Sequence, residues 1–199
     1  MTRIKLCGLM HPRDIHTANE LKPEYIGFVF AGGSRRYVSK HKAKELKARL
    51  SAGISAVGVF VDEEVGTVAE YLNEGIIDMA QLHGGESEVY IKQLRELSSK
   101  PVIKAFQIKS QDDLKQAEST TADHILLDAG KGDGKTFDWA YLEAMDRPYF
   151  LAGGLDPDNV HDAVRRLKPF AVDVSSGIET DGAKDADKMR AFTDAVRSA

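Results

Sequence analysis

The stretch Arg3-Ile4-Lys5-Leu6-Cys7-Gly8-Leu9 is a short apolar run that ends at a glycine, and it sets the pattern for the whole chain. A run of this length, bounded by glycine, is typical of a buried strand. Eight such runs occur, at residues 3–6, 25–30, 55–61, 77–82, 101–106, 123–127, 149–152 and 171–174. Longer charged and alanine-rich stretches with helical spacing lie between most of them, such as 40–50, 64–72, 86–97 and 158–167.

Strands that alternate with helices predict a parallel sheet, because each crossover between parallel strands needs a helix-length connection. The eight units follow one another without a linker or a change in composition, so we expect residues 1–199 to form one domain. The fold class is then α/β, with a single closed (β/α)8 (TIM) barrel. An open, doubly wound sheet of similar content is the alternative. The connections at 110–122 and 138–145 have the weakest helical pattern.

Composition narrows the classes of function. The chain of 199 residues is 42% hydrophobic and 29% charged, as expected for one well-buried globular core. Its net charge is −4 and its Lys and Arg residues are scattered, which argues against nucleic acid or an anionic membrane as a partner. The first residues lack the apolar core of a secretory signal, and no window is long enough to span a membrane. With one cysteine there is no internal disulfide, so we expect a cytoplasmic location.

In a barrel, the side chains at the carboxyl ends of the strands form the active face. Strand parity places Lys5 and Cys7 on one face of the first strand, and Asp173 on the corresponding face of the last. The apolar residues between them suit contact with helices, so these three side chains are expected inside the barrel. The last strand closes next to the first, which brings Asp173 near Cys7. A buried carboxylate requires a partner, and Lys5 is the candidate.

Two glycine loops follow the seventh and eighth strands, at Gly153-Gly154 and Ser175-Ser176-Gly177. Asp156 is predicted to be an N-cap, with Pro157 as the first residue of the next helix. Backbone N–H groups of two adjacent loops of this kind can hold an anion such as a phosphate without any lysine or arginine. A single glycine loop would indicate only a tight turn, but the pair at these positions predicts a phosphate site.

A second glycine-rich stretch, Ala129 to Thr136, follows the sixth strand and matches a relaxed nucleotide phosphate-loop pattern. Phe137-Asp138-Trp139 continues it poorly, because a true phosphate loop leads into a long helix. We therefore interpret it as a mobile active-site loop beside Asp128.

The histidines and arginines leave several interpretations open. His83 follows the fourth strand and could contact a phosphate or carboxylate, or only pack. The other histidines are dispersed, which argues against a metal site. Arg35 and Arg36 follow the second strand, where a guanidinium could clamp a planar carboxylate or form part of a solvated surface pair.

Motifs along nearly the whole chain, in order, resemble the phosphoribosylanthranilate isomerase family. They are Ile4-Lys5-Leu6-Cys7-Gly8-Leu9, Gly27-Phe28-Val29-Phe30, Ser34-Arg35-Arg36-Tyr37, Val57-Gly58-Val59-Phe60, Gln81-Leu82-His83-Gly84, Leu127-Asp128, Phe137-Asp138-Trp139, Ala152-Gly153-Gly154-Leu155 and Val172-Asp173-Val174-Ser175-Ser176-Gly177. The motif that contains the cysteine and the last motif are the most specific. The resemblance implies a (β/α)8 barrel that needs no cofactor and performs an Amadori rearrangement.

The resemblance also implies roles for individual residues. Cys7 would be the general base, Asp128 the general acid, and Arg36 the contact for the anthranilate carboxylate. The remaining substrate-binding candidates are the phosphate contacts Gly154, Ser176 and Gly177, and the strand-end residues His83, Asp173 and Ser175.

The resemblance implies that the chain converts N-(5-phosphoribosyl)anthranilate to 1-(o-carboxyphenylamino)-1-deoxyribulose 5-phosphate in tryptophan biosynthesis. Such an aldose-ketose isomerase would act as a monomer or homodimer. Met10, Asp133 and Asp181 depart from the family pattern in loops. Two alternatives remain: a histidine-pathway aminosugar phosphate isomerase, and a non-catalytic barrel that binds a phosphorylated ligand. The related histidine-pathway barrels usually have an aspartate where this chain has Cys7.

Overall fold

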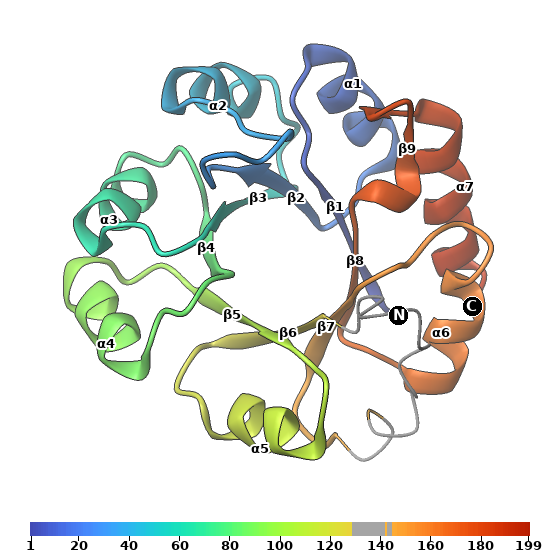
Figure 1. Cartoon of the computed structure of the whole chain (residues 1–199). Coiled ribbons are helices and arrows are strands. Elements are labelled where there is room, and N and C mark those ends of the chain that lie inside the picture. The colour runs from blue at the N-terminus through green and yellow to red at the C-terminus, as the bar shows by residue number, and fades with distance from the viewer. Residues whose placement is uncertain (129–141, 143–144) are drawn as a thin grey trace.

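A computed structural model describes residues 1–128, Leu142 and 145–199 of the chain (Figure 1). Eight parallel strands, each hydrogen-bonded to the next, form a closed barrel. They are β1 (Arg3–Cys7), β2 (Tyr25–Val29), β3 (Ser55–Phe60), β4 (Met79–Leu82), β5 (Val102–Gln107), β6 (His124–Asp128), β7 (Tyr149–Ala152) and β8 (Ala171–Val174). β8 pairs with β1 in the register that sets Lys5 beside Asp173. The predicted closed barrel is confirmed, and the alternative of an open sheet is wrong.

Helices surround the barrel (Figure 1). Those in the described part of the chain are α1 (Pro12–Leu21), α2 (Lys40–Lys47), α3 (Val65–Asn73), α4 (Glu88–Leu97), α5 (Gln111–Ser119), α6 (Val160–Leu167) and α7 (Ala186–Arg197). Serine side chains cap α2, α4 and α5 by accepting a backbone N–H of the first turn. The weak pattern at 110–122 is thus a helix with a capping box at Ser110 and Asp113. The connection at 138–145 falls largely outside the described residues.

The helix after β7 begins later than predicted. Asp156 does accept backbone N–H groups, from Asp158 and Asn159 at 3.0 Å each, as an N-cap would. Regular helix starts only at Val160, however, so Pro157 lies in the preceding turn and is not the first helical residue. The two backbone N–H groups that Asp156 accepts belong to this turn and not to the helix. The turn therefore forms a short loop between β7 and the start of α6.

The barrel interior is filled by a cluster of inward-facing side chains that includes Val57, Met79, Ile103, Leu126 and Phe150. At the amino ends of the strands, aromatic rings close this core. The ring of Phe150 packs against those of Tyr25 and Phe170, with centroids 5.3 and 5.5 Å apart. Because the lower part of the barrel is packed in this way, the space for a ligand lies at the carboxyl ends of the strands.

A small antiparallel hairpin follows β8 and a short 3-10 turn at Ser176–Ile178. Its strands are β9 (Glu179–Thr180) and β10 (Ala183–Lys184), and Lys184 pairs with Glu179. The two turn residues, Asp181 and Gly182, have φ of 51° and 78°. Two residues with positive φ make the tightest hairpin turn, and an Asp-Gly pair suits it. Asp181, which departs from the family pattern, is therefore the first residue of a regular hairpin turn.

No helix in the described part of the chain is long and apolar enough to cross a membrane.

Candidate active site

One cavity of about 360 Å³ lies at the carboxyl ends of the strands and gathers side chains from almost the whole barrel. It is lined by Cys7, Arg36, Val59, Gln81, His83, Asp128, Ala152, Gly153, Gly154, Leu155, Asp173, Val174, Ser175 and Ser176. Every site residue proposed from the sequence except Gly177 is in this set. Residues that are far apart along the chain thus share one opening.

Cys7 is the last residue of β1, and this residue is 7% exposed. Gly27 of β2 pairs with it, and a Cβ at that position would come within 2.6 Å of the sulfur, so the glycine leaves room for the thiol. Burial raises the pKa of Cys7 above its ordinary value. Lys5 and Lys184 favour the thiolate and Asp173 opposes it, but their sum does not cancel the effect of burial. The free protein therefore holds Cys7 as a thiol at neutral pH.

Lys5 and Asp173 form the predicted ion pair inside the barrel. The Lys5 Nζ lies 2.9 Å from the Asp173 Oδ1, and the two side chains are 0% and 10% exposed. Burial lowers the pKa of Lys5, but the charge and hydrogen bond of Asp173, together with the neighbouring Cys7 sulfur, outweigh burial and raise it overall. Lys5 is therefore a buried cation beside the thiol, and Asp173 balances its charge.

Asp128 is the last residue of β6, three strands from β1 around the closed barrel, and lies close to His83, which follows β4. The His83 Nε2 is 3.7 Å from the Asp128 Oδ2. The other ring nitrogen, Nδ1, is 2.8 Å from the amide nitrogen of Gln81. The sequence left a ligand contact or simple packing open for His83. The structure adds a contact between its ring and a carboxyl group in the same cavity.

Arg36 lies at the cavity edge and is held by a carboxylate that the sequence did not indicate. Its Nε and Nη2 donate hydrogen bonds to the Glu179 carboxylate at 2.6 and 2.9 Å. Arg35 donates to the same carboxylate at 2.8 Å, and Lys184 at 2.7 Å. Burial raises the pKa of Glu179, but the hydrogen bonds and charges of Arg36 and Lys184 lower it to about 2. The Arg36 side chain is 19% exposed and the Arg35 side chain is 60% exposed. The two arginines are therefore not simply a solvated surface pair, because Arg36 is largely buried against Glu179.

The two glycine loops meet at the side of the cavity. Gly153 and Gly154 have φ of 96° and 68°, a conformation that glycine adopts without strain. Gly177 packs behind the cavity against the loop after β7. A Cβ there would lie 2.0 Å from the Leu155 carbonyl oxygen, so only glycine permits this approach. The Ser175 hydroxyl donates to the Cys7 carbonyl oxygen at 3.2 Å and joins β8 to β1.

The sequence missed three residues around this cavity: Gln81, Glu179 and Lys184. The family motif contains Gln81, but nothing in the sequence marked its amide as a contact of His83. Glu179 and Lys184 belong to the two-residue strands of the hairpin, which are too short for a periodic pattern. The Asp181-Gly182 turn between them is the one local signal that could have indicated a hairpin.

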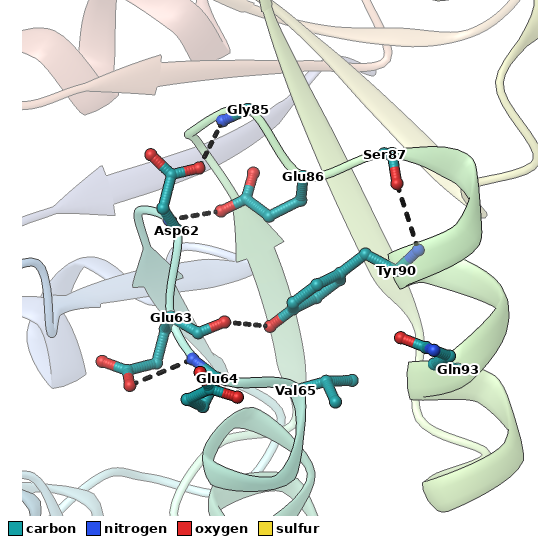
Figure 2. A pocket seen from close by; sticks show the side chains of 9 residues that line it. All are labelled: Asp62, Glu63, Glu64, Val65, Gly85, Glu86, Ser87, Tyr90 and Gln93. Carbon is teal, nitrogen blue, oxygen red and sulfur yellow. Dashed lines mark hydrogen bonds between the residues drawn. The ribbon is translucent and has the colours of Figure 1, made fainter.

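A second pocket, of about 380 Å³, lies between the loops after β3 and β4 (Figure 2). Carboxylates of Asp62, Glu63, Glu64 and Glu86 line it, so it repels an anionic ligand. Figure 2 shows that the Asp62 carboxylate accepts the backbone N–H of Gly85, and that the Glu86 carboxylate is turned to the backbone of Asp62. The Glu86 carboxylate accepts the backbone N–H groups of Asp62 and Gly84 at 2.9 Å each. This pocket is therefore a loop junction that fixes the turn after His83.

The glycine-rich stretch Ala129 to Thr136, including Asp133, lies outside the described residues. Within the described ranges, no three His, Cys, Asp or Glu side chains come together in a way that could hold a metal ion.

A closed eight-stranded barrel with a thiol, a carboxyl group and two glycine loops around one cavity at the carboxyl ends of its strands defines a (β/α)8-barrel enzyme. The family model of N-(5'-phosphoribosyl)anthranilate (PRA) isomerase matches residues 4–195. The chain belongs to this family. It is an isomerase, and the interpretation as a non-catalytic binding barrel is wrong.

Individual relatives agree with this assignment. The N-(5'-phosphoribosyl)anthranilate isomerase of Endomicrobium trichonymphae is 41% identical over 203 residues and covers 100% of both chains. The crystal structure of phosphoribosyl anthranilate isomerase from Thermotoga maritima has a TM-score of 0.92 at 34% identity and covers 100% of both chains. A structure of such an isomerase in complex with reduced 1-(o-carboxyphenylamino)-1-deoxyribulose 5-phosphate has a TM-score of 0.88 at 34% identity, again over 100% of both chains.

Proposed function

We propose that the chain converts N-(5-phosphoribosyl)anthranilate to 1-(o-carboxyphenylamino)-1-deoxyribulose 5-phosphate, with Cys7 as the general base and Asp128 as the general acid. This Amadori rearrangement belongs to tryptophan biosynthesis. The observation that carries the proposal is that Cys7 and Asp128, 121 residues apart along the chain, line the same cavity. A substrate seated there can receive a proton on one side and lose one on the other.

The first step opens the sugar ring. Asp128 in its protonated form delivers a proton to the furanose ring oxygen, the bond from that oxygen to C1 breaks, and the nitrogen lone pair forms an iminium with C1. Asp128 is left as a carboxylate. The His83 ring, with Nε2 3.7 Å from the Asp128 Oδ2, can stabilise that new negative charge.

The second step moves a proton from carbon. The Cys7 thiolate removes the proton at C2, the electrons of that bond neutralise the iminium, and an enolamine results. Tautomerisation returns a proton to C1 and converts the C2 hydroxyl to the ketone, so no atom is gained or lost. Because the pKa of Cys7 is raised, little thiolate is present at neutral pH, but each thiolate is a stronger base. The buried cation of Lys5 favours that thiolate.

The ends of the substrate have matching sites. The guanidinium of Arg36 uses Nε and Nη2 for Glu179, and no described contact occupies its Nη1, which suits a second carboxylate such as that of anthranilate. The loops that contain Gly154, Ser176 and Gly177 offer backbone N–H groups for the phosphate. All of these groups belong to the polypeptide, and the proposed reaction uses no cofactor.

The test is the decrease of substrate fluorescence during turnover by the wild-type protein and by Cys7→Ala and Asp128→Asn. We expect each variant to lose about 10²–10⁴-fold in kcat, the usual contribution of one general acid or base. Asp112→Asn, an exposed carboxylate on α5, is the matched control and should retain full activity. Near-normal turnover by both site variants would overturn the residue assignment. Turnover of the histidine-pathway aminosugar phosphate in place of N-(5-phosphoribosyl)anthranilate would overturn the substrate assignment.

A further inference from the structure

The amide of Gln81 is buried at the cavity with only one of its two polar atoms in use. Gln81 belongs to β4, is 1% exposed and lines the cavity. Its nitrogen is 2.8 Å from the His83 Nδ1. Its oxygen, Oε1, is among the buried side-chain atoms of the described residues that have no hydrogen-bond partner. A buried carbonyl without a donor is destabilising, so an acceptor kept at a ligand cavity suggests a donor on the ligand.

The hydrogen bond of the Gln81 amide nitrogen determines which ring nitrogen of His83 carries the proton. An amide N–H that points at Nδ1 needs a lone pair there, so the ring proton lies on Nε2. That nitrogen is the one that faces Asp128, at 3.7 Å. This distance is longer than a hydrogen bond, as is common in ligand-free catalytic sites, and substrate binding has to shorten it by about 0.7 Å.

The same contact opposes a second proton on the ring. An imidazolium would need an acceptor at Nδ1, where the structure places an amide donor. A cationic His83 would hold Asp128 as a carboxylate before the reaction and so remove the acid. The other titratable side chains that line the cavity are Cys7, Arg36 and Asp173. Arg36 is turned to Glu179, and Asp173 to Lys5, through the contacts described above.

We propose that Gln81 is a positioning residue for the reaction: its amide N–H holds His83 in the neutral Nε2–H tautomer facing Asp128, and its carbonyl accepts a hydrogen bond from a hydroxyl group of the sugar phosphate. The second half of this proposal rests on the function proposed above. The His83 N–H then stabilises the Asp128 carboxylate that forms when the ring opens, and the Gln81 carbonyl gains the partner that it lacks in the free protein.

The tautomer is measured first, in the free protein, from the ¹⁵N shifts of the His83 ring by NMR, with His83→Asn to assign the signals. We expect the proton on Nε2 in the wild type. In Gln81→Glu, a carboxylate replaces the amide donor and should place a proton on Nδ1. A wild-type ring with its proton on Nδ1 would refute the proposal, because the amide would then be turned the other way and its carbonyl would be occupied.

Kinetics separate the two halves of the amide. Gln81→Met keeps the length of the side chain but lacks both polar atoms, so kcat should fall and KM should rise, each up to about tenfold, the effect of one uncharged hydrogen bond. Gln81→Glu keeps an acceptor but loses the donor, so kcat should fall while KM changes much less. A merely structural role would not separate kcat from KM in this way. Unchanged kcat and KM in Gln81→Met would refute the proposal.

Two controls complete the design. Gln93→Met, an exposed glutamine of α4, should leave the tautomer, kcat and KM unchanged. Near-ultraviolet circular dichroism shows whether the Gln81 variants retain the native packing. Absence of turnover by the wild-type protein would refute the proposed function, whereas the tautomer in the free protein would still decide whether Gln81 positions His83.

Discussion

Replacing Glu179 with glutamine removes the negative charge on which Arg35, Arg36 and Lys184 converge. The Glu179 side chain is 4% exposed, so solvent screens these contacts weakly. In the Glu179→Gln variant the cations remain while the amide can receive fewer and weaker hydrogen bonds. We expect the loss to appear both in the stability of the fold and in the orientation of Arg36.

The magnitude follows from the protonation of Glu179. Its pKa falls from an ordinary value of 4.5 to about 2 in the folded chain, which corresponds to about 3 kcal/mol in favour of the folded carboxylate. Because the folded pKa is the lower one, this contribution is present in full above pH 4.5. It is lost as the pH falls from 4.5 towards 2. At pH 3 about 2 kcal/mol of it should be gone.

The assay is equilibrium unfolding in urea at pH 7 and pH 3 for the wild type and for Glu179→Gln. At pH 7 the variant should be less stable by about 3 kcal/mol, and the difference between the two proteins should shrink by about 2 kcal/mol at pH 3. Glu96→Gln, on the exposed side of α4, is the control and should match the wild type at both pH values. A difference at pH 7 below about 1 kcal/mol, or one that does not shrink in acid, would refute this reasoning.

The KM values of the Glu179→Gln variant test the same contact a second time. Without Glu179, the Arg36 guanidinium loses the pair of hydrogen bonds that orients it, at Nε and Nη2. We expect KM for a substrate with an aromatic carboxylate to rise about tenfold, and KM for an analogue without that carboxylate to change little. Equal changes for the two compounds would contradict the role of Glu179 in orienting Arg36.

Three further outcomes are expected. Because burial raises the pKa of Cys7, its thiolate should form only in the alkaline range, as measured by the ultraviolet absorbance difference between the free wild type and Cys7→Ser; a thiolate already fully formed at neutral pH would contradict this burial effect. Gly177→Ala places a Cβ 2.0 Å from a backbone oxygen of the loop after β7, so urea unfolding should show a loss of about 1–3 kcal/mol. Gly66→Ala in α3, with open space around it, should instead gain about 0.5–1 kcal/mol. Asp173→Asn leaves the Lys5 charge buried without its partner and should cost about 3–5 kcal/mol, most of it recovered in the double variant with Lys5→Met; an unchanged urea midpoint would argue that Lys5 is not held as a cation.

Much of the site could be placed from sequence because a parallel barrel converts chain order into position. Once the eight strands are recognised, the carboxyl end of each one points to the same opening. Parity then puts Lys5, Cys7 and Asp173 inside, and closure puts β8 beside β1, as found. The start of α6 was less predictable, because Asp156 caps the N–H groups of a turn as well as it would cap those of a helix.

The amino-acid sequence by itself determined the strand–helix alternation and, given a closed barrel, most of the side chains that face its carboxyl end. It could do so because hydrophobic periodicity and strand parity are local properties. The tertiary structure alone decided that Glu179 holds Arg36, 143 residues away, and that Gln81 turns its amide towards His83. It also decided that Cys7 is a thiol at rest, because desolvation depends on what surrounds the sulfur and not on its neighbours in the chain. Protonation and orientation are set by distances of a few ångströms between distant segments, and no local pattern encodes them.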